Sequence, residues 1–395
     1  REGEEDGTQE AHGLETRPRG AIGAICPGFG QEDGMDASVF FAGRYADARA
    51  RFLAAAAAAG AEIETHPHPL RGPEGERLAC DVARLGPARA SRALVTLSAT
   101  HGVEGHCGSG AQVATLREGL LRDLPRDTCA VAIHAINPHG FAWSRRVTED
   151  NVDLNRNFVD HAQPYPSNPG YEELREAICP PARDAATLAA AQRRLDAHAA
   201  AHGPMALQQA ISGGQYVDPQ GVFFGGHAPT WSNRLLRRIF ASLATHAADI
   251  AVIDYHTGLG PYGHGELIMS SKANPDGWRR ACDWLGKDEI TSPDLGNSSS
   301  APLVGINSQG MREAAPAARL TTVALEFGVR PLSETLDALR ADAWLHAHAE
   351  MDAPEWAETK ARMRHVFYGD EPRWKEMIVA RGFDVTRRML AGLSA

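Results

Sequence analysis

Four short runs of apolar and β-branched residues, separated by longer segments with helical periodicity, constrain the fold of this 395-residue chain more than any other feature. Runs this short and this apolar are typical of strands that are buried on both faces. Strands that alternate with helices predict a parallel or mixed sheet covered by helices on both sides. The four runs are Ala93–Ala99, Cys129–Ile136, Ile250–Tyr255 and Thr321–Phe327.

Helical patterns lie between these runs, and several begin with a Ser or Asn that suits a helix cap. The expected helices cover residues 44–60, 110–124, 185–202, 233–247, 276–285 and 333–351. Further helices are expected from residue 353 onward. The sequence therefore predicts an α/β protein.

The first 35 residues differ from the rest of the chain. They are acidic, rich in Gly and almost without large apolar residues, so they have too little surface to bury to offset the entropy of ordering. We expect a flexible acidic tail over residues 1–35 and a single folded domain over residues 36–395. With 43% hydrophobic residues, a chain of this length can bury one large core.

Composition also narrows the partners and the compartment. A net charge of −10 provides no attraction to phosphate backbones or anionic lipids, so we expect neither nucleic acid nor membrane partners. The six cysteines stand singly, as reduced core thiols do. No apolar run is long enough to span a bilayer, and the N-terminus has no signal-peptide pattern, so we expect a cytoplasmic protein. Because the chain starts at Arg1, a signal peptide that has been removed stays an alternative. The oligomeric state is not indicated.

The first apolar run leads directly into a loop with two potential metal ligands, His101 and Glu104. Imidazole nitrogen and carboxylate oxygen are both good zinc donors, and a spacing of two residues lets them reach one ion from a single turn. The H-x-x-E pattern by itself is common by chance. Its position after a strand strengthens it, because ligands of open α/β sheets collect beyond the carboxyl ends of the strands.

The third run ends at His256, which is followed by two glycines that allow the backbone to approach a ligand closely. His256 is therefore the natural third ligand, although a single His is more often a hydrogen-bonded core or surface residue. Two His and one Glu form the open ligand set of a catalytic zinc, whereas a structural site would more often use cysteines. Cys107 is expected to be a core thiol.

The fourth run carries a carboxylate, Glu326, inside an otherwise apolar strand. Desolvation there should raise its pKa, as a general base for water at a zinc site requires. The alternative is a structural salt bridge with an Arg or Lys elsewhere in the chain.

The second run is followed by a polar stretch, residues 145–158, with several arginines and amides. A guanidinium binds a carboxylate through two hydrogen bonds, and Asn155 can add a third. Either Arg145 or Arg146 is a candidate to stabilise the oxyanion of a tetrahedral intermediate. A solvated loop with internal salt bridges is the alternative.

Taken in order, the motifs HGVEG, VDLNRNF, DYHTG and ALEFG resemble those of the zinc carboxypeptidase superfamily. Its relatives include the succinylglutamate desuccinylase and aspartoacylase group of deacylases. The resemblance spans about residues 93–330 and implies a three-layer α/β/α sandwich with a mixed, mostly parallel central sheet. It also implies one zinc ion per chain.

The resemblance implies a role for each matching residue. His101, Glu104 and His256 would bind zinc, and Glu326 would be the base. Asp153 would orient His101, as metal-bound imidazoles generally require. The remaining residues implied are two that bind the substrate carboxylate, Asn155 and Arg156, and one that polarises the scissile carbonyl, Arg146, with Arg145 as a substitute.

Two departures bear on the substrate. Between the third ligand and the base, digestive carboxypeptidases carry a mobile Tyr, whereas this chain has only Tyr262, close to His256. The polar residues of this interval either line a specificity pocket or form a solvated loop, and they are Asn297, Ser298, Ser299, Ser300, Asn307 and Gln309. A long insertion, residues 159–225, is expected to shape the mouth of the pocket.

Three functions are compatible with these residues. The first is a zinc peptidase resembling metallocarboxypeptidases that acts on a small, carboxylate-bearing peptide. The second is a zinc deacylase of N-acyl amino acids or amines. The third, a non-catalytic zinc-binding protein, is disfavoured because all three ligands and the base are present.

Overall fold

The computed structural model describes residues 36–351 and 353–395. The tail expected over residues 1–35 lies outside the described residues, as does Cys26. The other five cysteines are free. In the described part of the chain, no helix is both long and apolar enough to cross a bilayer.

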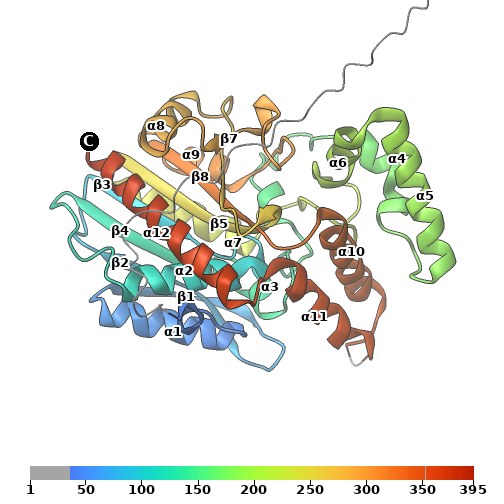
Figure 1. The fold of residues 1–395 in the computed structure, drawn as a ribbon, viewed down its shortest axis with the longest axis horizontal. Helices are drawn as coiled ribbons and strands as arrows, with labels where there is room; N and C mark the ends of the chain where they lie inside the picture. Colours follow the sequence, from blue (N-terminus) through green and yellow to red (C-terminus); the bar gives the residue numbers. More distant parts are fainter. Residues whose placement is uncertain (1–35, 352) are drawn as a thin grey trace, which may run out of the picture. The chain divides into compact units, whose positions relative to one another are not determined.

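A mixed sheet of eight strands forms the centre of the fold, in the order β1-β2-β4-β3-β5-β8-β6-β7 (Figure 1). The four apolar runs are its inner strands β3, β4, β5 and β8, and the pairs among them are all parallel. Antiparallel pairs join β1 to β2, β2 to β4 and β6 to β8. The strands are β1 Glu62–Arg71, β2 Arg77–Leu85, β3 Arg92–Leu97, β4 Thr128–His134, β5 Asp249–Tyr262, β6 Glu266–Ile268, β7 Ile290–Thr291 and β8 Arg319–Gly328.

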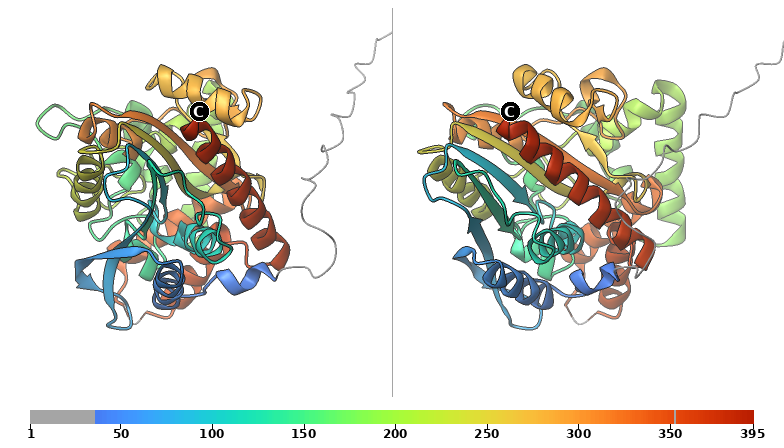
Figure 2. Two further views of the ribbon diagram at one scale, coloured as in Figure 1. Left: turned by 90° about the vertical axis from the view of Figure 1, so that its left-hand side faces the viewer. Right: turned by 60° about the vertical axis from the view of Figure 1, so that its left-hand side comes forward.

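Helices cover both faces of this sheet, so the α/β/α sandwich is confirmed. On one face, α1 (Tyr45–Ala58), α2 (Gly105–Arg117), α8 (Pro275–Leu285) and α12 (Pro372–Ser394) enclose a large apolar core. Figure 2 shows α12 running along this face. On the other face, α7 (Trp231–Leu243) and α9 (Asn307–Ala314) pack on a second core.

A further group of helices shares a third apolar cluster that includes Val103, from the loop after β3. The helices of this group are α4 Pro169–Ile178, α5 Ala185–His202, α6 Pro204–Ser212, α10 Leu332–His348 and α11 Glu355–Phe367, and a short α3 Pro138–Ala142 follows β4. Three of them, α4 to α6, make up most of the insertion 159–225. The insertion therefore contains the helix expected over residues 185–202, which is α5 with the same bounds, and two further helices, α4 and α6.

Several sequence predictions need correction at their boundaries. The helix expected over residues 110–124 spans Gly105–Arg117, immediately after the 3₁₀ turn Gly102–Glu104, and the helix expected over residues 233–247 ends at Leu243. The strand expected to end at Tyr255 continues to Tyr262, because β8 goes on pairing with it through Thr257. A shift in the pairing follows and is absorbed at Gly258 and Gly260, whose φ angles are 118° and 83°, a region that favours glycine.

Strands β1 and β2 were not expected from the sequence. Most residues of β1 are exposed, so it lacks the apolar alternation that identifies a strand. Strand β2 pairs antiparallel with β4, and β1 pairs antiparallel with β2, so the two strands extend the sheet at one edge without contributing to the site.

Candidate metal centre

His101 and Glu104 are brought together by a tight turn after β3. The 3₁₀ turn Gly102–Glu104 directs both side chains to one side, with His101 Nδ1 2.9 Å from Glu104 Oε1. The turn lies against α3 so closely that a Cβ on Gly102 would be 2.0 Å from the carbonyl carbon of Gly140. Only glycine fits this position, so the backbone geometry of the turn depends on it.

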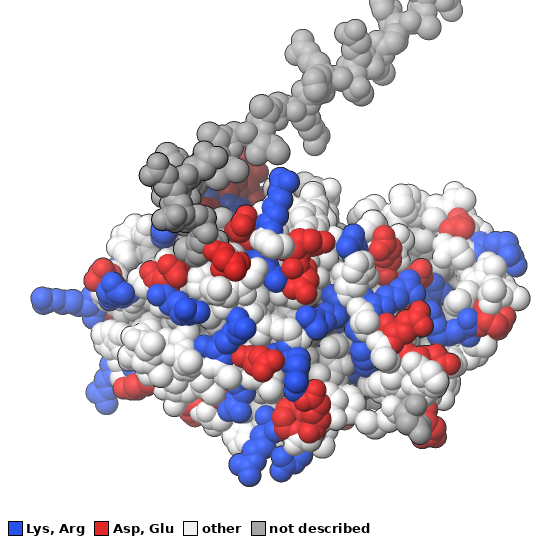
Figure 3. Space-filling model, turned by 60° about the horizontal axis from the view of Figure 1, so that its bottom comes forward, with Lys and Arg blue, Asp and Glu red and all other residues white. Residues whose placement is uncertain are grey.

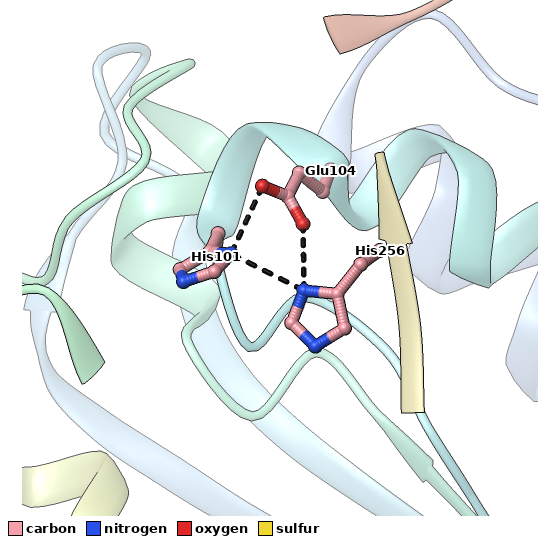
Figure 4. A group of neighbouring side chains, drawn as sticks. All are labelled: His101, Glu104 and His256. Carbon is pink, nitrogen blue, oxygen red and sulfur yellow. Dashed lines mark hydrogen bonds and ion pairs between the residues drawn. The ribbon is translucent and has the colours of Figure 1, made fainter. Parts of the chain in front are cut away.

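His256 completes a group of three potential ligands. Its Nδ1 is 3.2 Å from His101 Nδ1 and 3.0 Å from Glu104 Oε2, and all three residues are buried. Figure 4 shows the two rings and the carboxylate pointing toward one another. The predicted ligands therefore converge, although His256 lies within β5 rather than beyond its end.

The Nε2 atom of each imidazole lies within hydrogen-bond distance of a carboxylate. Asp153 Oδ1 is 3.2 Å from His101 Nε2, as the resemblance implies. Asp254 Oδ2 is 2.8 Å from His256 Nε2. These contacts turn the two Nδ1 atoms toward each other and toward Glu104, which is the usual arrangement around metal-binding histidines.

Asp254 belongs to the candidate site by its contacts but was not predicted from the sequence. Its carboxylate also accepts hydrogen bonds from Thr100 Oγ1, at 2.8 Å, and from Asn307 Nδ2, at 2.6 Å. The signal was present, because residues two apart on a strand share a face and Asp254 precedes His256 by two. An apolar run that ends in Asp-x-His therefore predicts a metal-binding His and a carboxylate that accepts a hydrogen bond from its ring.

The electrostatics of the three ligands suit a cation. Burial alone would raise the pKa of Glu104, but the charges and hydrogen bonds of His101 and His256 hold it well below its usual range. Burial alone would lower the pKa of His256, but Asp254 and Glu104 raise it well above its ordinary value. Two nitrogens 3.2 Å apart beside a buried carboxylate form a donor set typical of zinc.

Replacing Asp254 by Asn is expected to weaken zinc binding by about 10- to 100-fold, because His256 loses the carboxylate that orients its ring. The dissociation constant can be measured by competition with a chromophoric chelator. The matched control is Asp249→Asn at the start of the same strand, where the carboxylate pairs with Arg319 at the surface. Equal affinities for the two variants would contradict a role for Asp254 at the metal.

Glu326 lies beside His256 on the neighbouring strand. The two residues are partners in the parallel register of β5 and β8, and adjacent strands are about 4.8 Å apart. Burial and the charge of Glu104 raise the pKa of Glu326 to about 8. Its Oε1 accepts a hydrogen bond from the backbone N–H of Leu259, at 3.0 Å. Among the described residues, no Lys or Arg forms an ion pair with it, so the structural salt bridge considered above is not formed.

The structure separates the two adjacent arginines. Arg146 reaches the site, where its Nη1 donates to Glu104 Oε1 at 3.1 Å and its Nε to Asp153 Oδ2 at 2.9 Å. Arg145 turns the other way, and its Nε donates to the buried carboxylate of Asp342 at 2.9 Å. The pocket beside the metal ligands is lined by Arg146 and not by Arg145. The geometry gives Arg145 a structural contact in place of the substrate contact expected for it.

Asn155 and Arg156 both line the same pocket. Arg156 already donates hydrogen bonds from two of its N–H groups to the backbone carbonyls of Asn155 and Ser212. Its guanidinium also lies over the Phe223 ring. The side-chain oxygen of Asn155 accepts from the N–H of Asn307. A guanidinium has five N–H donors, so Arg156 retains donors for a ligand.

The polar residues between the third ligand and the base divide into two sets. Ser300 and Asn307 line the pocket, and Asn307 also donates to Asp254. Gln309 bonds Glu313 on its own helix. Asn297, Ser298 and Ser299 form loop contacts with Ser292 and Glu266. Tyr262 is exposed and donates to Glu371.

The insertion shapes the mouth of the pocket, as expected. Gln208 and Ser212 from the α6 segment and Phe223 from the end of the insertion all line it. Its remaining wall is largely apolar, with contributions from β6, β8 and the loop before α9. A concave, mostly apolar pocket with a few convergent polar groups is typical of a site for a small molecule.

The chain was compared with known families and structures. A family model described as a protein of unknown function, DUF2817, matches residues 41–381, and no curated protein matches the chain. Similar solved structures include bovine thrombin-activatable fibrinolysis inhibitor in complex with tick carboxypeptidase inhibitor, with 10% identity over 88% of this chain and 98% of that chain and a TM-score of 0.42. Carboxypeptidase A from Helicoverpa armigera shows 14% identity over 82% and 73% of the chains, also with a TM-score of 0.42.

Glutaminyl cyclase from Fimbriiglobus ruber is also similar, with 10% identity over 90% of this chain and 91% of that chain and a TM-score of 0.42.

Proposed function

The chain belongs to the DUF2817 family, whose members are described as proteins of unknown function, and we propose that it is a zinc-dependent hydrolase of amide or peptide bonds. One observation carries the proposal. The strand register sets Glu326 beside His256, so a buried carboxylate with a raised pKa lines the same pocket as His101 and His256, two of the three potential metal ligands.

His101, Glu104 and His256 would hold the metal, one ion per chain. When bound, zinc at such a site polarises a carbonyl group and makes a water molecule easier to deprotonate. The fit rests on the convergence of the two Nδ1 atoms and the Glu104 carboxylate described above.

Glu326 would serve as the base. Its carboxylate takes the proton from the attacking water and later delivers it to the leaving amine. Its place beside His256 and on the pocket wall suits both steps, because a positioned carboxylate can accept a proton from water and give it up to the amine. The Leu259 N–H, bonded to Oε1, keeps the carboxylate oriented toward the pocket.

Arg146 would stabilise the oxyanion that forms during attack. Its guanidinium lies next to the metal ligands and lines the pocket, where a fixed positive charge can act on developing negative charge. Asn155 and Arg156 would bind the carboxylate of the substrate through charge-assisted hydrogen bonds. Together these residues favour a small substrate that carries a carboxylate near the scissile bond.

A deacylase of N-acyl amino acids is the second candidate. The carboxylate-binding residues serve it equally well. The only Tyr between the third ligand and the base, Tyr262, is bonded to Glu371 and does not line the pocket. Digestive carboxypeptidases carry a mobile Tyr in this interval, so we propose the broader class of amide hydrolase rather than a carboxypeptidase of the digestive type.

The zinc-loaded protein can be tested on a matched panel of dipeptides with free C-termini, the same dipeptides with amidated C-termini, and N-acyl amino acids that differ in the acyl group. We expect turnover that is lost on amidation. If turnover is insensitive to the acyl group, the enzyme is a peptidase, and if it depends on the acyl group, it is a deacylase. No hydrolysis of any compound would contradict the proposed function.

On the face shown in Figure 3, Lys and Arg side chains are intermixed with Asp and Glu side chains. This face therefore has no extended region of one sign, and charge on it provides no directional attraction for a polyanion.

A further inference from the structure

The pocket continues from the metal ligands along β8. Glu326, Ala324 and Thr322 all line it, as expected for residues spaced by two on one face of a strand. At 3.3 Å per residue, the Cα atoms of Thr322 and Glu326 lie about 13 Å apart. The small side chain of Ala324 leaves this path open, so a substrate group can extend well beyond the scissile bond.

Thr322 places an unsatisfied polar atom along this path. The residue is only 9% exposed, and its Oγ1 has no hydrogen-bond partner among the residues that the structure describes. Buried hydroxyl groups are nearly always bonded, because an unpaired one costs free energy. A group from a bound molecule would supply the missing partner.

Arg312, on α9, lines the same pocket and also lacks a partner. It is half-buried, and within residues 36–351 and 353–395 its guanidinium takes part in no hydrogen bond or ion pair. The neighbouring Glu313 is engaged elsewhere, with Arg237 at 2.8 Å and Gln309 at 2.9 Å. Burial lowers the pKa of Arg312, and the charge of Glu313 opposes this effect.

The other charged groups that line the pocket already have partners. Arg146 is paired with Glu104 and Asp153, and Arg156 is 3.9 Å from Asp153. Asp294 accepts hydrogen bonds from the hydroxyl of Ser270 and the N–H of Lys272. Arg312 is therefore the one pocket-lining cation of the described residues whose charge is not compensated.

We infer that this part of the pocket binds an acidic side chain of the substrate, with the guanidinium of Arg312 on its carboxylate and the hydroxyl of Thr322 as a further donor. The inference rests on the proposed function and narrows its substrate class. A planar guanidinium matches a carboxylate through two hydrogen bonds, and apolar walls strengthen that attraction by excluding water. A neutral side chain would leave Arg312 without a partner in a half-buried site.

The test uses two nearly isosteric substrates, N-benzoyl-Gly-Glu and N-benzoyl-Gly-Gln, with the zinc-loaded protein. We expect kcat/KM to favour the Glu substrate by about 10- to 100-fold, the range of a charge-assisted pair. Arg312→Met should abolish this preference and change hydrolysis of the Gln substrate little. Arg238→Met, an exposed arginine on α7, is the matched control and should retain the preference.

A second readout does not depend on turnover. Calorimetric titration with free glutamate and free glutamine should show tighter binding of glutamate, and Arg312→Met should remove the difference. Thr322→Val, which keeps the shape and removes the hydroxyl, should reduce it. If Arg312→Met does not fold, Arg312→Gln takes its place.

The outcomes separate the two proposals. A wild-type protein that hydrolyses the peptides without preferring Glu, or an Arg312 variant that keeps the preference, would overturn the inference and leave the proposed function standing. A protein that hydrolyses nothing but binds glutamate through Arg312 would support the binding site and overturn the proposed function.

Discussion

Replacing Glu326 by Gln is expected to leave zinc bound and to lower kcat by about 10²- to 10⁴-fold, the usual contribution of a positioned general base. The amide fills the same space but cannot accept the proton of water. Burial and the charge of Glu104 already raise the pKa of Glu326 to about 8, so removing its charge should not destabilise the fold. Steady-state kinetics, zinc content and thermal unfolding of the same sample provide the three measurements.

The control for this variant is Glu334→Gln. Glu334 is an exposed carboxylate in the first turn of α10, close in sequence to residues that line the pocket. It undergoes the same chemical change without touching the reacting groups, and its kcat should equal that of the wild type. An unchanged kcat for Glu326→Gln would remove this residue from the mechanism.

Removing the metal is expected to abolish activity and to lower the melting temperature. The rate effect should reach several orders of magnitude, because metal ions at such sites contribute several kcal/mol to lowering the barrier. Ligand binding to the folded state alone stabilises it by about 4 kcal/mol when the ligand is present at a thousand times its dissociation constant. Dialysis against a chelator, followed by a zinc titration that restores both activity and melting temperature, measures the two effects together.

The variant His256→Ala tests the requirement for the metal without a chelator. The variant should contain little zinc after purification, and added zinc should not restore its activity. His246→Ala, at an exposed position after α7, controls for the loss of a histidine and should bind zinc as the wild type does. Full activity in a chelated, metal-free sample would contradict the proposed mechanism.

Much of the fold and site follows from local sequence. The inner strands were found because a buried strand needs a continuous apolar run, which is visible in six to eight residues. His101, Glu104, His256 and Glu326 were found because each stands within or immediately after such a run. The structure brings the three ligands together and places Glu326 in register with His256. The outer strand β1 was missed because exposed residues carry little pattern.

Other assignments depended on tertiary structure. Arg145 and Arg146 have the same chemistry and differ by one position, so sequence could not choose between them. The choice was made by their partners, since Arg145 meets Asp342 from α10 whereas Arg146 meets Glu104. These partners lie 197 and 42 residues away along the chain.

Local sequence also could not identify the roles of three other residues, Asp254, Asn307 and Arg312. Asn307 donates to Asp254 across 53 residues of sequence, and Arg312 is distinguished only by the partners it lacks. The sequence by itself determined the inner strands, several of the helices between them and the residues able to bind a metal, because backbone periodicity and ligand chemistry are local properties. The tertiary structure decided which charges are paired and which face the pocket, because that depends on packing between segments far apart in the chain.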